Sequence, residues 1–274
     1  MSGGFPLGLE VCNGVDIGSV TATSAGTSLT SGAANAYGSF AQLIASTASD
    51  TEWMAVNLHG GTNASSFQCA IQIAVGASGS EKAIIHDLVL QCDSPTILTV
   101  CLPISIPAGT RISAAAAAAT ASDGPFPINC QLFDGAFTQT EGVAGVDSIG
   151  FVSASTQGTT ITGSGTTNTK GSYSQLIAST TRDYLGFFFA QDTLNATVIA
   201  ASSYLFDIAI GASGSEVPIA PNVLGTAVAS LGLNLPITSG LYPIPIPAGS
   251  RISARLQSVA ASKTIGLTLY GLYR

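Results

Sequence analysis

Ile106-Pro-Ala-Gly-Thr-Arg-Ile-Ser-Ala114 occurs a second time, as Ile246-Pro-Ala-Gly-Ser-Arg-Ile-Ser-Ala254, with eight of nine residues identical. Three earlier blocks also return in the same order: Gly14–Gly18 as Gly145–Gly150, Ser39–Thr47 as Ser172–Thr180, and Gly76–Glu81 as Gly211–Glu216. The offset grows only from 131 to 140 residues, so the chain is a tandem duplication of a unit of about 130 residues. We expect repeats at 1–137 and 143–274, joined by a short polar linker at 138–142.

Period-two alternation inside the repeated blocks predicts β-strands. Phe67–Ile73 and Tyr204–Ile210 alternate large apolar residues with small or polar ones, and each stops at a Gly-Ala-Ser-Gly turn signal. The Pro-Ala-Gly segments predict strand–turn–strand corners, because proline cannot occupy a central ladder position and glycine allows positive φ. Val152–Thr162, a β-branched alternation, predicts a further strand. Each half also ends on an aromatic strand, Gln131–Gly135 matching Thr268–Gly271.

Breakers recur about every 10 residues, which is the rhythm of a sandwich or a jelly roll rather than of βαβ units. The sequence therefore predicts an all-β protein made of two tandem β-sandwich, jelly-roll-like domains.

The six alanines of Ala114–Ala119 conflict with this interpretation, since alanine is the strongest helix former. Their counterpart in the second repeat is Ala254–Val259, which lies between the same corner and the same final strand. Because one fold has to serve both repeats, we expect a strand here, with small side chains that allow close packing. A single helical turn in the first repeat is the alternative.

The composition limits the classes of partner. Only 8% of residues are charged, against about 25% in a typical soluble domain, and the polar residues are mostly Ser and Thr. Residues 1–137 hold nine acids and two bases, residues 138–274 hold six of each, and Lys and Arg never cluster. A nucleic-acid partner is therefore not expected. A surface of small and hydroxyl side chains is easily desolvated, which suits contacts between protein subunits; a secreted monomer is the alternative.

The apolar stretches fall short of the roughly 20 residues that a membrane-spanning helix needs, so no membrane partner is expected. Met1–Pro6 has neither the basic nor the apolar region of a signal peptide, which predicts assembly in a cytoplasm. The five cysteines, an odd number at wide spacings, indicate neither a zinc site nor a disulfide framework. We interpret them as small buried hydrophobes in a reducing compartment.

No residue pattern supports catalysis, so we predict that the chain is not an enzyme and that it uses no cofactor and no metal. His59 and His86 lack counterparts in the other repeat and have no metal-ligand spacing. The carboxylate pairs Asp50 with Glu52, and Asp87 with Asp93, could in principle perform glycoside chemistry. Solvation of loops explains these carboxylates equally well.

Four charged pairs return with the duplication: Asp16 with Asp147, Asp50 with Asp183, Glu81 with Glu216, and Arg111 with Arg251. They suit a subunit contact or a ligand site, but a structural role is the stronger interpretation. Each arginine follows an Ala-Gly-x turn and can fork onto a carboxylate of its own repeat. The candidate structural corners are therefore Glu81 with Arg111 and Glu216 with Arg251, and we expect Arg251 to pair with Glu216 or Asp183.

Three of the repeated segments resemble repeats in virion structural proteins of tailed bacteriophages. They are Gln-Leu-Ile-Ala-Ser-Thr at 42–47 and 175–180, Gly-Ala-Ser-Gly-Ser-Glu at 76–81 and 211–216, and Tyr242–Arg255. The resemblance covers nearly all of both repeats and implies a β-sandwich on the phage particle, in the tail, baseplate or fibre, or as a capsid decoration. It implies partners among copies of the chain and other virion proteins, and it carries no catalytic or binding residue over.

A carbohydrate- or receptor-binding module on the virion is the alternative function, with a host-surface glycan as the partner. Such a module needs exposed aromatic side chains beside polar groups. Trp53, the sole tryptophan, is the candidate, although its neighbours Met54 and Val56 favour a place in the core.

Overall fold

The computed structural model describes residues 13–18, 21, 25–59, 68–91, 97–134, 142–192, 203–226 and 240–274. Every regular element in these ranges is a β-strand, which confirms the predicted all-β class. No helix in the same ranges is long and apolar enough to cross a membrane. Most of the expected linker, 138–141, lies outside the described residues.

The first repeat contributes β1 (Asn13–Ile17), β2 (Thr27–Leu29), β3 (Ala41–Ile44), β4 (Trp53–His59), β5 (Gln68–Val75), β6 (Lys82–Gln91), β7 (Ile97–Leu102), β8 (Ile112–Ala118) and β9 (Phe126–Asp134). The second contributes β10 (Gly145–Ile149), β11 (Thr159–Thr162), β12 (Ser174–Ile177), β13 (Gly186–Asp192), β14 (Ser203–Ile210), β15 (Val217–Thr226), β16 (Ile252–Ser258) and β17 (Thr264–Tyr273).

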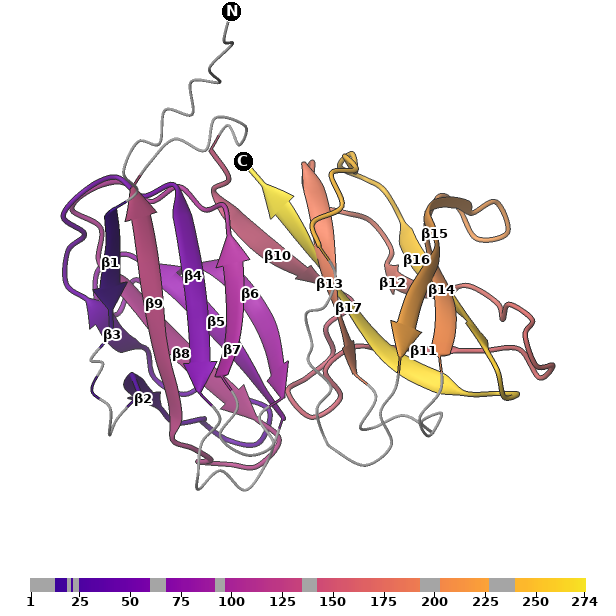
Figure 1. The fold of residues 1–274 in the computed structure, drawn as a ribbon, viewed down its shortest axis with the longest axis horizontal. Helices are drawn as coiled ribbons and strands as arrows, with labels where there is room; N and C mark the ends of the chain where they lie inside the picture. The colour runs from indigo at the N-terminus through magenta and orange to yellow at the C-terminus, as the bar shows by residue number, and fades with distance from the viewer. Residues whose placement is uncertain are drawn as a thin grey trace, which may run out of the picture.

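The strand order repeats with the sequence. In the first repeat β1, β2 and β4 pair with β9, and β7 pairs with β4; the facing sheet runs β6-β5-β8-β3. In the second repeat β10, β11 and β13 pair with β17, and the facing sheet runs β15-β14-β16-β12. Each repeat is therefore a two-sheet sandwich, and the two sandwiches lie side by side (Figure 1).

The polyalanine segment forms β8, with every residue from Ile112 to Ala118 buried, which confirms the expected strand. Ala114, Ala116 and Ala118 face the core of the first sandwich. On the opposite face, Ala117 packs with Ala154 of the second repeat. Small side chains are needed here because both faces of the strand are covered.

Two sequence interpretations change in the structure. Only Thr159–Thr162 of the predicted strand Val152–Thr162 is a strand; the preceding residues form a turn, with Gln157 at φ 55°, that lies against the first repeat. The final strands also match at a different register. Trp53 pairs with Phe133 where its counterpart Gly186 pairs with Leu272, so Phe133 corresponds to Leu272 and not to Tyr270. A two-residue shift keeps each side chain on the same face, so alternation alone cannot detect it.

The two sandwiches share one sheet and part of one core. β10 pairs in parallel with β6 through Val146 and Ile85, which joins the first repeat's facing sheet to the second repeat's β17 sheet (Figure 1). Phe188, Tyr270 and Leu272 point away from their own sandwich and belong to the core of the first. Because that core is incomplete without the second repeat, the described parts of both repeats form one packed body.

A buried tyrosine connects the repeats through backbone hydrogen bonds. The hydroxyl of Tyr270 accepts a hydrogen bond from the amide of Val89 (2.8 Å) and donates one to the carbonyl of Asp87 (2.9 Å). The Asp87 carboxylate accepts hydrogen bonds from Tyr37 of the first repeat (2.7 Å) and from Ser148 of the second (2.5 Å). These bonds fix the bulge of β6 at Asp87, where φ is 48°, against the second repeat.

Replacing Tyr270 with Phe should lower the free energy of unfolding by about 1–3 kcal/mol, because it leaves a buried amide and carbonyl unpaired. Both repeats should still unfold in one transition, measured by urea denaturation. Tyr173→Phe is the control: among the described residues its hydroxyl has no hydrogen-bond partner, so the change should stay within about 0.5 kcal/mol. A Tyr270→Phe protein as stable as the wild type would contradict the proposed connection.

Candidate functional site

The four corner candidates come together as two matching ion pairs. Arg111 Nη1 lies 3.0 Å from Glu81 Oε1, and Arg251 Nη1 lies 3.0 Å from Glu216 Oε1. In both repeats the arginine side chain is 16% exposed and the glutamate 8%. Of the two partners open to Arg251, the structure therefore selects Glu216 and not Asp183.

Each arginine makes further bonds inside its own repeat. Arg111 donates to the carbonyl of Gly76 and, through Nε, to Gln42 Oε1 (3.1 Å). Arg251 donates in the same way to Gly211 and to Gln175 Oε1 (3.0 Å). The guanidinium thus joins three of the repeated sequence blocks, and its geometry is the same in both copies.

The glutamates of the corners are held in their charged form. Glu81 Oε2 accepts the amide of Gly79 (2.7 Å), and Glu216 Oε2 accepts the amide of Gly214 (2.9 Å). A hydrogen bond from its own backbone amide, followed by those from the arginine and the glycine amide, lowers the pKa of each glutamate below its usual value against the opposing effect of desolvation.

A second network closes each corner, and sequence reasoning missed it. Thr180 is 3% exposed; its hydroxyl donates to the carbonyl of Pro247 (2.8 Å) and accepts the amide of Ser250 (3.0 Å). Asp183 accepts the amide of Ala248 (2.7 Å). The first repeat makes the same bonds, which are Thr47 to Pro107 (2.8 Å), Thr110 to Thr47 (3.0 Å) and Ala108 to Asp50 (2.8 Å). The sequence did contain a signal for this network, because the spacing Thr-x-x-Asp occurs in both repeats, as Thr47 with Asp50 and as Thr180 with Asp183.

The glycine of each Pro-Ala-Gly corner has the expected conformation. Gly109 and Gly249 both have a φ of 79°, where a side chain would be strained. Their amides donate to the carbonyls of Thr47 and Thr180, both at 2.8 Å. The corner is therefore one interlocked unit of loop, threonine and aspartate.

Asp16 and Asp147 are not structural counterparts. Ile17 pairs with Cys130 and Ile149 with Leu269, and this register makes Ser148 the counterpart of Asp16. Asp147 instead lies at the junction of the repeats. Its carboxylate is 3.1 Å from Arg182 Nε, accepts the Tyr184 hydroxyl at 3.0 Å, and lies 4.0 Å from Nε2 of His86.

Asp207 is a buried carboxylate on the outer face of the second sandwich, and hydrogen bonds satisfy both of its oxygens. Asp207, 1% exposed, receives hydrogen bonds from Lys170 (2.7 Å to each oxygen), Arg255 (2.8 Å) and the amide of Asn222 (2.8 Å). Burial alone would raise the pKa of this carboxyl, but these hydrogen bonds outweigh it and hold the pKa below its usual value. Two cations and a backbone amide thus surround a single negative charge, so the group serves as a structural brace.

The residues considered for glycoside or metal chemistry are only partly described by the structure. Asp50 and Asp87 are bound as described above, while Asp93 and the side chain of His59 lie outside the described residues. In the described part of the chain, no three His, Cys, Asp or Glu side chains come together as metal ligands would.

The cysteines only partly follow the sequence interpretation. Cys69 and Cys130 are fully buried, and burial raises the pKa of the Cys130 thiol to about 12. Both therefore behave as the expected small hydrophobes. Cys101 is free and exposed, which corrects that interpretation for this residue. Cys12 and Cys92 lie outside the described residues.

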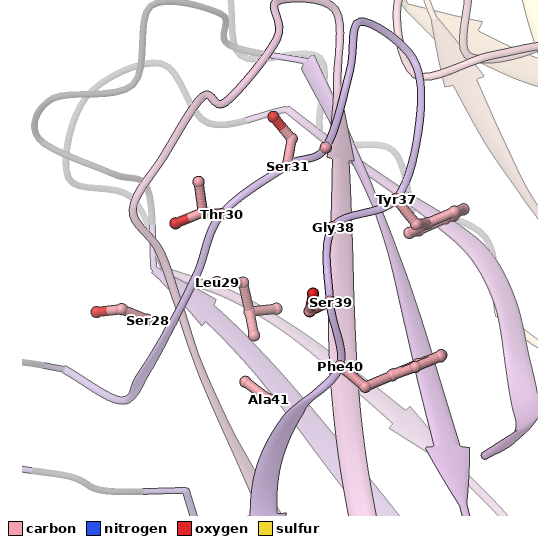
Figure 2. A pocket seen from close by; sticks show the side chains of 10 residues that line it. Ser28, Leu29, Thr30, Ser31, Tyr37, Gly38, Ser39, Phe40 and Ala41 are labelled. Atoms are coloured by element: carbon pink, nitrogen blue, oxygen red, sulfur yellow. The ribbon is translucent and has the colours of Figure 1, made fainter. Parts of the chain in front are cut away.

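An open hollow of about 660 Å³ lies between residues 28–32 and 37–41 (Figure 2). The rings of Tyr37 and Phe40 point away from the strand that carries Ser28 and Thr30 (Figure 2). The Tyr37 hydroxyl is engaged by Asp87, and this bond and burial raise its pKa. The lining of the hollow combines hydroxyl side chains, such as those of Ser28, Thr30 and Ser39, with backbone and with the apolar side chains of Leu29 and Ala41.

A smaller crevice of about 220 Å³ lies between the repeats beside Trp53. Its first-repeat wall is Trp53 and Thr99–Pro103, and its second-repeat wall is Phe188, Gly240, Leu241 and Leu272. Trp53 is partly exposed, which corrects its expected place in the core, whereas Met54 and Val56 are fully buried on the other face of β4. The crevice is smaller than the hollow, and residues of both repeats form its walls.

The described fold and corners define an all-β protein of two fused sandwiches. No protein-family model matches the sequence, and no curated protein sequence matches it. Among solved structures, PNGase F, a glycosylasparaginase from Flavobacterium meningosepticum, aligns with 95% of this chain and 96% of its own at 13% identity and a TM-score of 0.39. A likeness this distant carries no argument about function.

Thr180→Val should lower the free energy of unfolding by about 1–3 kcal/mol, because the buried Thr180 loses two part-buried hydrogen bonds, to the carbonyl of Pro247 and from the amide of Ser250. Thr47→Val should cost a similar amount, since the first corner has the same bonds. Thr167→Val, at an exposed site, is the matched control and should stay within about 0.5 kcal/mol. Urea denaturation measures all three, and a large loss in one repeat only would show that the corners are not equivalent.

Glu216→Gln should lower the Tm at pH 7 by about 2–4 °C, because the side chain loses the charge that pairs with Arg251 at the surface turn. Because the pKa of this carboxyl is lowered in the folded state, its contribution is present above the ordinary glutamate pKa of about 4.3 and is lost as the pH falls through the lower folded value. Thermal melts from pH 7 to pH 3 should therefore show the two proteins converging. Glu52→Gln controls for loss of a charge outside the corners, and a Tm difference that persists at pH 3 would refute the brace.

Proposed function

We propose that the chain is a non-catalytic structural subunit of a tailed-bacteriophage virion and that it assembles through protein–protein contacts. The proposal places it in the tail, baseplate or fibre, or on the capsid as a decoration, and its partners are copies of itself and other virion proteins.

One observation carries the proposal: most of the charged residues that the duplication kept are used inside their own repeat. Arg111 and Arg251 brace matching turns, and Asp50 and Asp183 cap matching loops. A duplicated binding or catalytic site would instead keep polar groups that are directed toward a ligand. What has been copied is the framework of a rigid block.

The junction supports the same role. Since the repeats share a sheet and a core, a load on one sandwich is transmitted to the other without a hinge between their described parts. An assembled particle needs subunits that hold one shape. The composition adds a surface with few charges to desolvate when neighbouring subunits cover it.

Mass spectrometry of purified virions of the phage that encodes the chain tests the proposal directly. The protein should be present in many copies per particle and should remain after nuclease treatment and washing. Light scattering of the isolated protein should give the mass of an oligomer, and a structure of that oligomer should show symmetric contacts that each bury about 1,200 Å² or more. Absence from the particles, or a monomer that turns over a substrate, would overturn the proposal.

A further inference from the structure

The outward face of the sheet that contains β1, β9, β4 and β7 carries an ordered set of side chains. Successive residues of a strand alternate between faces, and Met54, Val56 and Leu132 point into the core. The residues between them, read across the paired strands, form three rows: Phe133 with Trp53; Asp16, Gln131, Ala55 and Cys101; and Asn129, Asn57 and Thr99. The strands β1, β9, β4 and β7 lie next to one another (Figure 1). Their pairing therefore places an aromatic pair beside two largely uncharged polar rows.

The polar row of Asn129, Asn57 and Thr99 is partly preorganised. The hydroxyl of Thr99 donates to Oδ1 of Asn57 at 2.6 Å, which holds the carboxamide in one orientation. On the neighbouring strand, Oδ1 of Asn129 is buried and has no hydrogen-bond partner among the described residues. A buried acceptor of this kind costs free energy unless a donor reaches it.

The corresponding face of the second repeat has diverged completely. Phe188 stands where the first repeat has Ala55, Ala190 where it has Asn57, and Tyr270 where it has Gln131. Those residues are buried against the first repeat. In the second repeat this face is apolar and forms the contact with the first repeat. In the first repeat the same face is rich in amide side chains.

The inter-repeat crevice opens beside these rows. Trp53, Thr99 and Cys101 belong both to the outward face and to the crevice wall, and Leu241, 48% exposed, closes the opposite side. Its volume of about 220 Å³ is below the roughly 300–1,000 Å³ of typical ligand pockets, so it accommodates a single ring. Apolar walls beside convergent amide and hydroxyl groups suit a ligand that has an apolar face and polar edges.

We propose that this face and crevice bind one neutral saccharide ring of a glycan, with Trp53 as the aromatic platform and Asn57, Thr99 and Gln131 as hydrogen-bond partners. Carboxamides and hydroxyls supply the mixed donors and acceptors that sugar hydroxyls need. An anionic sugar is disfavoured, because Asp16 is exposed on the same face and residues 1–137 carry nine acids against two bases.

An apolar side chain of a protein partner fits the chemistry less well. It could fill the crevice, but it would cover Asn57, Gln131 and Thr99 without supplying their hydrogen bonds, which is costly. The saccharide proposal does not depend on the place of the chain in a virion, since binding is measured on the isolated protein.

The sole tryptophan makes the site directly observable, since all tryptophan emission comes from Trp53. Titration of the full chain with a panel of neutral mono- and oligosaccharides should shift the emission of Trp53 and protect it from quenching by acrylamide. Asn57→Ala and Thr99→Val, both on the surface of the sheet, should each weaken binding about tenfold, while melts check that folding is unchanged. Trp53→Phe, followed by calorimetry, should weaken binding and should not abolish it.

Thr30→Val is the matched control, because it removes an exposed hydroxyl from the open hollow of Figure 2 and should leave binding unchanged. The proposal is overturned if no neutral saccharide alters the emission up to millimolar concentration. It is also overturned if Thr30→Val weakens binding as much as Thr99→Val, or if only charged saccharides bind. Presence in virions without saccharide binding would refute this site and leave the structural proposal standing.

Discussion

An unpaired strand edge exposes backbone N–H and C=O groups that seek partners, and β6 would be such an edge if the first repeat stood alone. In the structure β10 covers it through the pair Val146 and Ile85, and Tyr270 satisfies the amide of Val89 and the carbonyl of Asp87 behind it. The rest of the architecture depends on this contact. It places the outward face of the β17 sheet against the open side of the first sandwich, so that Phe188 and Leu272 complete a core which the first repeat leaves unfinished.

The same contact explains why the two copies have diverged where they have. The corners lie inside each repeat, and both repeats make the same hydrogen bonds there. Arg111 and Arg251, for example, donate to the carbonyls of Gly76 and Gly211. The outward faces have different neighbours, so they differ: Phe188 is buried at the junction, whereas its counterpart Ala55 lies between polar and aromatic side chains. In the absence of other constraints, differences between the copies are therefore the best guide to what each surface contacts.

How far the sequence predicts this structure depends on the distance over which each feature acts. The strand class and the Arg–Glu corners follow from local alternation and from pairing of opposite charges, and the strand at Ala114–Ala118 follows from the requirement that both copies fold alike. The junction could not be predicted, because Tyr270 and Asp87 are 183 residues apart and the bond between them has no counterpart in the other repeat. The register of β17 was missed because a two-residue shift preserves alternation. Trp53 was placed in the core because its buried neighbours hide the fact that it occupies the opposite face.

The edge strand of the second repeat differs from its counterpart in the first repeat. β15 is the counterpart of β6, and Ala220 pairs with Ile208 as Ile85 pairs with Ile73. The residue after Ala220 is Pro221, where β6 has His86, and Pro218 stands where β6 has Ala83. Proline has no N–H to donate, so a further strand cannot pair with β15 as β10 pairs with β6. Prolines on an edge strand also discourage pairing between chains. Since β15 is a poor edge for strand addition, we do not expect the proposed assembly to grow along it. Contacts through the faces of the sandwiches and their loops would instead cover a surface of few charges and small side chains, which is the least costly to bury.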